Sequence, residues 1–182
     1  IAEGTTAVET VAITDTDTGD SNTCTRAGAD AALFTCTVTA TQYVLAFANA
    51  EDYDDPDDAG GNNVYDVTVT ISDGTNTGST ITYAVTVTDA NDQTPTYSSS
   101  DTTPDIAEGT TAVETVAITD TDTGDNNVCT RAGADAALFT CTVSATQYVL
   151  AFASAEDYES ADDSGGNGVY DVTVTISDGT NT

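Results

Sequence analysis

The stretch Val64-Tyr65-Asp66-Val67-Thr68-Val69-Thr70-Ile71-Ser72-Asp73-Gly74 decides the fold class of this chain. From Val67 to Ile71, apolar residues alternate with threonine, so an extended strand would have one apolar face and one polar face. β-branched residues suit such a half-buried pleated surface. The Asp-Gly pair at 73–74 is typical of a turn. The stretch therefore predicts a β-strand that ends in a tight turn.

The same alternation recurs on both sides of this stretch. It is found in Phe34-Thr35-Cys36-Thr37-Val38, in its later copy from Phe139 to Val143, and in Ile81-Thr82-Tyr83-Ala84-Val85-Thr86-Val87-Thr88. No segment has the sustained 3.6-residue apolar period of an amphipathic helix. About seven short strands in each repeat predict an all-β protein, a tandem Greek-key β-sandwich of the immunoglobulin-like type.

The chain repeats itself at a domain-sized interval. Residues 1–77 align with residues 106–182 without a gap, at a shift of 105 positions and with nine differences. We therefore expect one repeat over 1–97, a linker over 98–105 and a second repeat over 106–182. The second repeat has no counterpart of residues 78–105, so we expect it to lack its final strand within this chain. Further repeats after Thr182 would supply that strand, and donation by a neighbouring molecule is the alternative.

The charge balance restricts the function. The 182 residues include 31 Asp and Glu against two Lys and Arg, with no His, for a formal net charge of −29. Nucleic acid and anionic membranes are excluded as partners because both require clustered basic residues. No apolar run is long enough to insert into a membrane. Without histidine the commonest general base is missing, and no pair of acids stands out, so we predict that the chain is not an enzyme.

Five motifs in a fixed order carry a family resemblance. They are Ala2-Glu3-Gly4-Thr5, Asp15-Thr16-Asp17, Asp52-Tyr53-Asp54 (Asp157-Tyr158-Glu159 in the second copy), the stretch from Val64 to Gly74, and Thr88-Asp89-Ala90-Asn91-Asp92-Gln93-Thr94-Pro95. With these motifs each repeat resembles a cadherin-like domain of the prokaryotic tandem-repeat kind. The resemblance covers essentially the whole chain.

The resemblance implies a Ca²⁺ cluster at each junction between repeats. Carried over to this sequence, the central site would use Glu3, Asp52, Asp54, Asp89, Asn91 and Asp92, the backbone carbonyls of Ala90 and Gln93, and Asp120, Asp122, Asp178 and the carbonyl of Asn127 from the second repeat. Half-sites shared with neighbouring repeats would be formed by Asp15, Asp17 and Asp73 before the first repeat, and by Glu108, Asp157 and Glu159 after the second.

The residue types independently suit calcium. Ca²⁺ binds six to eight oxygens, mostly from carboxylates and carbonyls, and these motifs supply only such ligands. Asp54 stands where the family has a longer Glu. The alternative for the junction acids is a solvated acidic surface. For Asp55, Asp57 and Asp58, in the loop where the two copies differ most, solvation is the simpler interpretation.

Each repeat has two cysteines twelve positions apart. An even number with one pair per domain is typical of an oxidising compartment. Cys36 shares a strand face with Phe34 and Val38, and the resemblance places Cys24 facing inward on the adjoining strand. We expect the disulfides Cys24–Cys36 and Cys129–Cys141, with buried free thiols as the alternative. Zinc is disfavoured by the spacing and by the absence of histidine.

The leading functional hypothesis is structural. We expect a segment of an extracellular or cell-surface tandem-repeat protein that Ca²⁺ stiffens into a rod or filament. Its partners would be neighbouring repeats or identical copies in a fibre. The alternative is a calcium-dependent adhesin or an array of carbohydrate-binding modules that attaches to surface glycans.

Overall fold

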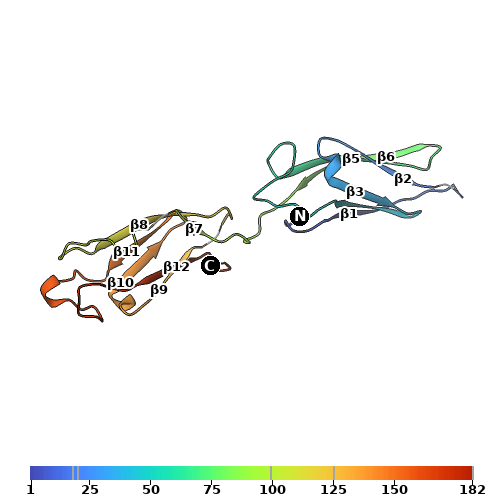
Figure 1. Ribbon diagram of the computed structural model, residues 1–182. Coiled ribbons are helices and arrows are strands. Elements are labelled where there is room, and N and C mark those ends of the chain that lie inside the picture. The colour runs from blue at the N-terminus through green and yellow to red at the C-terminus, as the bar shows by residue number, and fades with distance from the viewer. Residues whose placement is uncertain (18, 20, 99, 125, 182) are drawn as a thin grey trace. The chain divides into compact units, whose positions relative to one another are not determined.

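A computed structural model describes residues 1–17, 19, 21–98, 100–124 and 126–181. The chain forms two compact units, Ile1–Ala90 and Asn91–Thr182. Figure 1 shows each unit as two facing β-layers joined by loops. The predicted antiparallel all-β sandwich is therefore confirmed. Among the described residues no helix is long and apolar enough to cross a membrane.

Unit 1 consists of two three-stranded sheets. Its elements are β1 (Ala7–Ala12), β2 (Thr23–Ala27), the short 3-10 helix η1 (Ala31–Leu33), β3 (Phe34–Val38), β4 (Gln42–Phe47), β5 (Val64–Ser72) and β6 (Thr77–Thr86). The strand orders are β1-β4-β3 and β2-β5-β6, with antiparallel pairing throughout. Consecutive strands β2 and β3 lie in different sheets, which is the crossing expected of a Greek key.

Unit 2 repeats this arrangement with one difference in each of its two sheets. Its elements are β7 (Thr96–Tyr97), β8 (Ala112–Thr119), β9 (Val128–Ala132), η2 (Ala136–Leu138), β10 (Phe139–Val143), β11 (Gln147–Phe152), η3 (Tyr158–Ser160) and β12 (Thr173–Ser177). The sheets are β10-β11-β8-β7 and β12-β9. Within the part of unit 2 that the structure describes, nothing corresponds to β6, as predicted from the repeat alignment.

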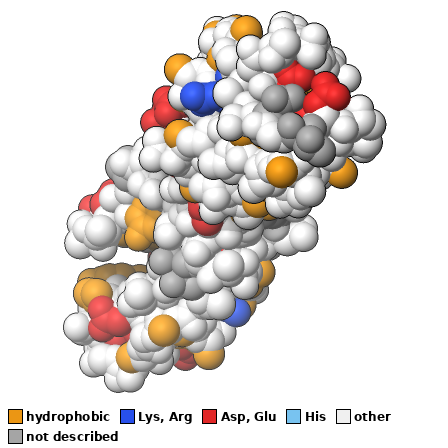
Figure 2. Space-filling view, turned by 90° about the vertical axis from the view of Figure 1, so that its right-hand side faces the viewer, with side chains coloured by type: hydrophobic (Ala, Val, Ile, Leu, Met, Phe, Trp, Pro, Cys, Tyr) orange, Lys and Arg blue, Asp and Glu red, His pale blue; other side chains and the backbone are white. Residues whose placement is uncertain are grey.

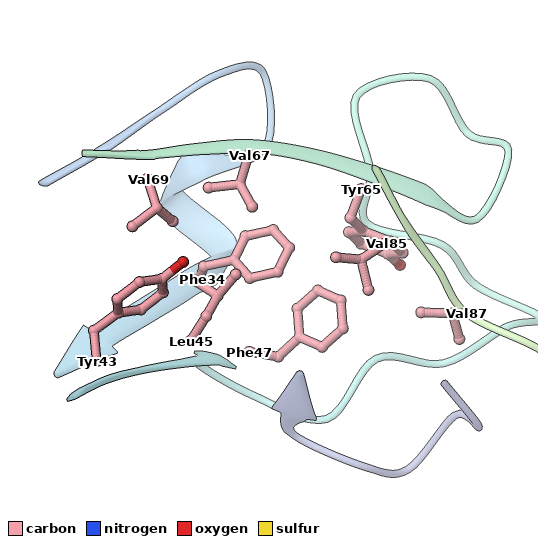
Figure 3. Close-up of a cluster of buried hydrophobic side chains, with 9 residues drawn as sticks. All are labelled: Phe34, Tyr43, Leu45, Phe47, Tyr65, Val67, Val69, Val85 and Val87. Carbon is pink, nitrogen blue, oxygen red and sulfur yellow. The ribbon is translucent and has the colours of Figure 1, made fainter. Parts of the chain in front are cut away.

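Alternating side chains build the core between the two sheets. Phe34, Leu45 and Phe47 point from β3 and β4 toward Val67 and Val69 of β5 (Figure 3). Leu45 is completely buried, and Phe34 stacks on Phe47 with ring centroids 4.5 Å apart. The threonines between these residues face outward, as the alternation predicts.

Two disulfides connect the facing sheets. Cys24 on β2 is bonded to Cys36 on β3, and Cys129 on β9 to Cys141 on β10, each with a Cα–Cα distance of 6.1 Å. Both predicted pairs are confirmed. Because β2 and β3 belong to different sheets, each bond links the two layers of its sandwich.

Gly28 lets its own backbone approach that of Asp66 closely beside this core. The Cα of Gly28 has a φ of 117°, and a Cβ there would lie 2.7 Å from the carbonyl oxygen of Asp66. Only glycine adopts this conformation without strain and also fits the space. The approach lets the N–H of Asp30 donate to the same carbonyl, at 3.2 Å.

Candidate metal centre

In unit 1, the carboxylate of Glu3 holds together the two ends of the repeat. One oxygen accepts a hydrogen bond from the N–H of Ala90 at 2.5 Å, and the other from the N–H of Tyr53 at 2.7 Å. The backbone of Glu3 also donates to the carbonyl of Thr88, beside a parallel bridge between Ala2 and Thr88. Glu3 is only 9% exposed. The first residues of the unit are therefore fastened to the point where the chain leaves it.

The other predicted ligands of unit 1 lie around this carboxylate. The side chain of Asp52 accepts a hydrogen bond from the N–H of Asp54 at 2.9 Å. Asp54 and Asp89 each present a carboxylate oxygen within 4.8 Å of the other. The structure thus gathers Glu3, Asp52, Asp54, Asp89 and Ala90, which are far apart in sequence, at one end of unit 1.

Unit 2 gathers its predicted ligands around the segment Asn91–Gln93. The N–H of Gln93 donates to Asp122 Oδ2 at 2.8 Å, and the N–H of Asp122 donates to Asp120 Oδ1 at 3.3 Å. The side-chain amide of Asn181 donates both to Asn91 Oδ1, at 2.8 Å, and to Asp178 Oδ2, at 3.2 Å. The side chain of Gln93 donates to the exposed Asp92.

The loops after β5 and β12 keep an aspartate ionised in both units. The pKa of Asp73 is lowered by hydrogen bonds from the backbone of Asn76 and Thr75. At Asp178 burial raises the pKa, but hydrogen bonds from the backbone of Asn181 and Thr180 outweigh it, and the net shift is downward. An ionised carboxylate at this position favours cation binding.

Two buried oxygens in unit 2 are suited to binding a cation. Asp122 Oδ1 and Asn127 Oδ1 are buried and have no hydrogen-bond partner among the described residues. A buried polar atom without a partner is costly, and oxygen is the atom that Ca²⁺ binds. The donor set therefore fits a hard divalent cation. For Asn127 this points to the side-chain oxygen, whereas the resemblance implied its backbone carbonyl.

The acidic residues of the two predicted half-sites lie in different surroundings. Glu108, Asp157 and Glu159 of unit 2 are exposed, and each offers a carboxylate oxygen within 4.8 Å of the others. Glu108 accepts from the N–H of Tyr158 at 3.3 Å. In unit 1, Asp15 accepts a hydrogen bond from the N–H of Asp17 at 3.0 Å, and Asp15 and Asp73 line one cleft.

One acidic residue interpreted as solvated is instead buried. Asp58 is 6% exposed, and its carboxylate accepts hydrogen bonds from the N–H groups of Gly60, Asn62 and Asn63. The solvated interpretation is therefore wrong for this residue. Backbone N–H groups of the loop that follows surround its carboxylate. The signal for this loop in the sequence was the run Gly-Gly-Asn-Asn at 60–63, which is typical of a turn.

Two further residues that organise these loops were missed. Asp30 accepts hydrogen bonds from the N–H groups of Ala59 and Asp66, both at 2.7 Å, and so ties the 54–63 loop to β5. Asn181 links the loop after β12 to Asn91. Neither residue belongs to the five motifs.

On the face drawn in Figure 2, acidic side chains form separate patches among backbone, uncharged and hydrophobic atoms, and basic side chains appear only in small spots. On this face the acidic side chains are therefore dispersed rather than gathered in one acidic surface.

Solved cadherin ectodomains share this fold. The chain is similar to protocadherin gamma B2 extracellular cadherin domains 3–6, with 19% identity over 97% of this chain and a TM-score of 0.63. It is also similar to protocadherin gamma B7 extracellular cadherin domains 1–4, with 23% identity over 86% of this chain and a TM-score of 0.57. It spans 40% and 36% of those chains, respectively. No family model and no curated protein matches the sequence. The chain therefore folds as tandem cadherin-like domains.

Proposed function

We propose that this chain is a segment of an extracellular, calcium-rigidified tandem-repeat protein that forms a rod or filament at the cell surface. The observation that carries the proposal is that Asp122 Oδ1, in a carboxylate held by the N–H of Gln93, and Asn127 Oδ1 are buried without a hydrogen-bond partner among the described residues. Bound calcium would give such oxygens a partner. The fold supports the proposal, because the solved structures that share it are extracellular cadherin domains.

The proposed inter-repeat site draws on both repeats. Its ligands from repeat 1 (1–97) and repeat 2 (106–182) would be Glu3, Asp52, Asp54, Asp89, Ala90, Asn91, Asp92, Gln93, Asp120, Asp122, Asn127 and Asp178. Carboxylates brought together without a cation would repel one another. Bound Ca²⁺ would remove this repulsion and fix the linker, so that flexibly linked domains would become a stiff rod. The half-sites extend the same arrangement to neighbouring repeats.

The direct test is calcium binding to the 182-residue chain, measured by isothermal titration calorimetry after removal of divalent ions. We expect saturable binding that Asp122→Asn weakens by on the order of tenfold or more, since one charged ligand is lost. Asp171→Asn is the matched control, because Asp171 is an exposed acid that is not among the proposed ligands. Equal weakening by both variants would indicate nonspecific charge screening and contradict the proposal.

A further inference from the structure

Strand β6 is a long edge strand of unit 1. In the sheet β2-β5-β6 it pairs with β5 on one side only. It has ten residues, whereas the other edge strands of this unit, β1, β2 and β3, have five or six. A long edge strand invites pairing with another chain unless charges, proline or a covering segment prevent it.

The sequence of β6 has none of the residues that usually prevent such pairing. Residues 75–88 include no Asp, Glu, Lys, Arg or Pro. By contrast, β1 carries Glu9 and β2 carries Arg26. Because the whole chain has a net charge of −29, two copies repel each other least where acids are missing. The charge pattern therefore makes β6 a surface that tolerates the approach of a second copy.

The even-numbered residues of β6 direct their backbone groups away from β5. Thr86 and Thr88 show this directly, because both bond to Ile1 on the outer side of the strand. The amino group of Ile1 donates to the carbonyl of Thr86 at 2.7 Å, and the N–H of Thr88 donates to the carbonyl of Ile1 at 2.8 Å. Along a strand, successive residues direct their N–H and C=O groups to opposite sides. The even-numbered residues before Thr86 therefore also face outward.

Three of these residues form an open segment of the edge, namely Thr80, Thr82 and Ala84. All three are exposed. Among the described residues, no strand or bridge pairs with β6 on this side before Thr86. The open segment therefore offers three N–H and three C=O groups to a partner strand.

A repeat placed before this one would not cover the open segment. Ile1 and Glu3 both face β6 through their hydrogen bonds. By alternation, the next residue to face the strand lies two positions before Ile1. Its counterpart within this chain is Pro104, two positions before Ile106. Proline has no N–H to donate to the carbonyl of Ala84, so the pairing stops short of the open segment.

The side chains beside the open segment form an uncharged ladder across the sheet. The hydroxyl of Thr82 shares a hydrogen bond with that of Thr68 on β5, and Thr80 does so with Thr70, each at 3.1 Å. Cross-strand threonine pairs of this kind stabilise a sheet. A second β6 strand would bring threonines of its own and continue the ladder.

We propose that the open segment of β6 pairs antiparallel with the same segment of a second copy, with the Thr82 residues of the two copies opposite each other. Thr80 of each copy then lies opposite Ala84 of the other, and all the outward backbone groups of the segment are used. Three residues per copy make a weak contact. In a tandem array, which rests on the proposed function, the contact recurs once per complete repeat, and repetition strengthens the association.

Cross-linking through an introduced cysteine tests the pairing in the 182-residue chain. All four native cysteines are in disulfides, so Thr82→Cys adds a single free thiol. Opposite residues of a hydrogen-bonded antiparallel pair have Cα atoms about 5.5 Å apart, which a disulfide spans. In a mildly oxidising glutathione buffer with EGTA, we expect Thr82→Cys to form a covalent dimer on the order of tenfold faster than Thr25→Cys. Thr25 is the matched control because it is exposed on β2, the other edge of the same sheet.

Amide hydrogen exchange of the covalent dimer tests the geometry. The comparison is with the Thr82→Cys monomer whose thiol has been alkylated. We expect slower exchange at Thr80 and Ala84, whose N–H groups gain partners in the second copy. Exchange at Ile81 and Tyr83 is expected to stay the same, because their N–H groups already face β5.

Three results would overturn the proposal. The first is an equal rate of cross-linking for Thr82→Cys and Thr25→Cys. The second is a covalent dimer in which Thr80 and Ala84 exchange as they do in the monomer. The third is slower exchange confined to β12, which would place the contact in unit 2. Because both measurements are made in EGTA, a chain that pairs through Thr82 but does not bind calcium would contradict the proposed function and leave the paired edge supported.

Discussion

Glu3 accepts a hydrogen bond from the N–H of Ala90, 87 positions later in the chain. Its second oxygen accepts one from Tyr53. One buried carboxylate therefore connects the start of unit 1, the loop that carries Asp52 and Asp54, and the exit of the chain. The carboxylate that we propose as a calcium ligand therefore also makes hydrogen bonds that stabilise the fold.

Glu3→Gln is expected to destabilise unit 1 even in EGTA. An amide retains one acceptor oxygen, so one of the two backbone N–H groups loses its charged partner at a cost of about 1–3 kcal/mol. Urea denaturation followed by NMR signals of unit 1 measures the effect. Glu9→Gln is the control, because Glu9 is exposed on β1. If the two variants unfold at the same urea concentration, the structural role of Glu3 is refuted.

Reduction of the disulfides is expected to lower the unfolding free energy of each unit by about 3 kcal/mol, since each bond closes a loop of about a dozen residues in the unfolded chain. Urea denaturation with and without a reductant measures this change. A Cys24→Ala/Cys36→Ala double variant should lose the effect in unit 1 and keep it in unit 2. Identical curves for the oxidised and reduced wild-type chain would contradict the expectation.

The carboxylate of Asp58 is expected to make a pH-dependent contribution to the stability of unit 1. Burial raises its pKa, but hydrogen bonds from the backbone of Asn62, Asn63, Gly60 and Gly61 outweigh this, and the pKa is lowered. A lowered folded-state pKa contributes stability above the ordinary value of about 3.9, and this contribution is lost as the pH falls through the lowered pKa. Asp58→Asn should therefore destabilise unit 1 at neutral pH and progressively less in acid.

The measurement for Asp58 is urea denaturation across the acid range, with Asp55→Asn as control. Asp55 is an exposed acid of the same loop, and the second copy has Ser160 in its place. A difference between Asp58→Asn and wild type that stays constant with pH would show that ionisation of this side chain does not matter.

A substitution between the copies accompanies a difference in tyrosine exposure. Asn63, at a φ of 60°, donates from its side chain to the carbonyl of Tyr53 at 2.9 Å. Its counterpart Gly168 keeps a positive φ of 73° but has no side chain. Tyr158, the counterpart of Tyr53, is 77% exposed.

Gly168→Asn is expected to reduce the exposure of Tyr158. Asparagine tolerates the left-handed conformation better than most residues, and its amide can restore the bond to the carbonyl of residue 158. Nitration of tyrosine by tetranitromethane, followed by peptide mass spectrometry, reports the exposure. The reverse change, Asn63→Gly, should make Tyr53 more reactive, and unchanged nitration in both variants would exclude this explanation.

The strands and the disulfides could be predicted because their signals are local. Alternation of Val and Thr determines which face of β5 is buried, and the motifs placed Cys24 and Cys36 on adjoining strands. Strand β7 could not be predicted in this way, because two residues have no periodicity. Its position depends on a partner strand, β8, that follows it by many residues.

The residue types of the candidate site could be predicted from the sequence, but several of its contacts could not. The motifs identified the acids that gather at the ends of each unit, because oxygen ligands are recognisable in sequence. They gave no indication that Asn181 would hold Asn91, or that Asp58 would be enclosed by backbone N–H groups. Both contacts depend on the path of a loop, which residue types alone do not determine.

The measurement that tests the account most directly is small-angle X-ray scattering of the chain in Ca²⁺ and in EGTA. If calcium holds successive repeats in a fixed arrangement, chelation will change the maximum dimension and broaden the distance distribution. A chain carrying Asp89→Asn and Asp122→Asn should scatter in Ca²⁺ as the wild type does in EGTA, whereas Glu9→Gln should not. Superimposable wild-type profiles in the two buffers would contradict the account.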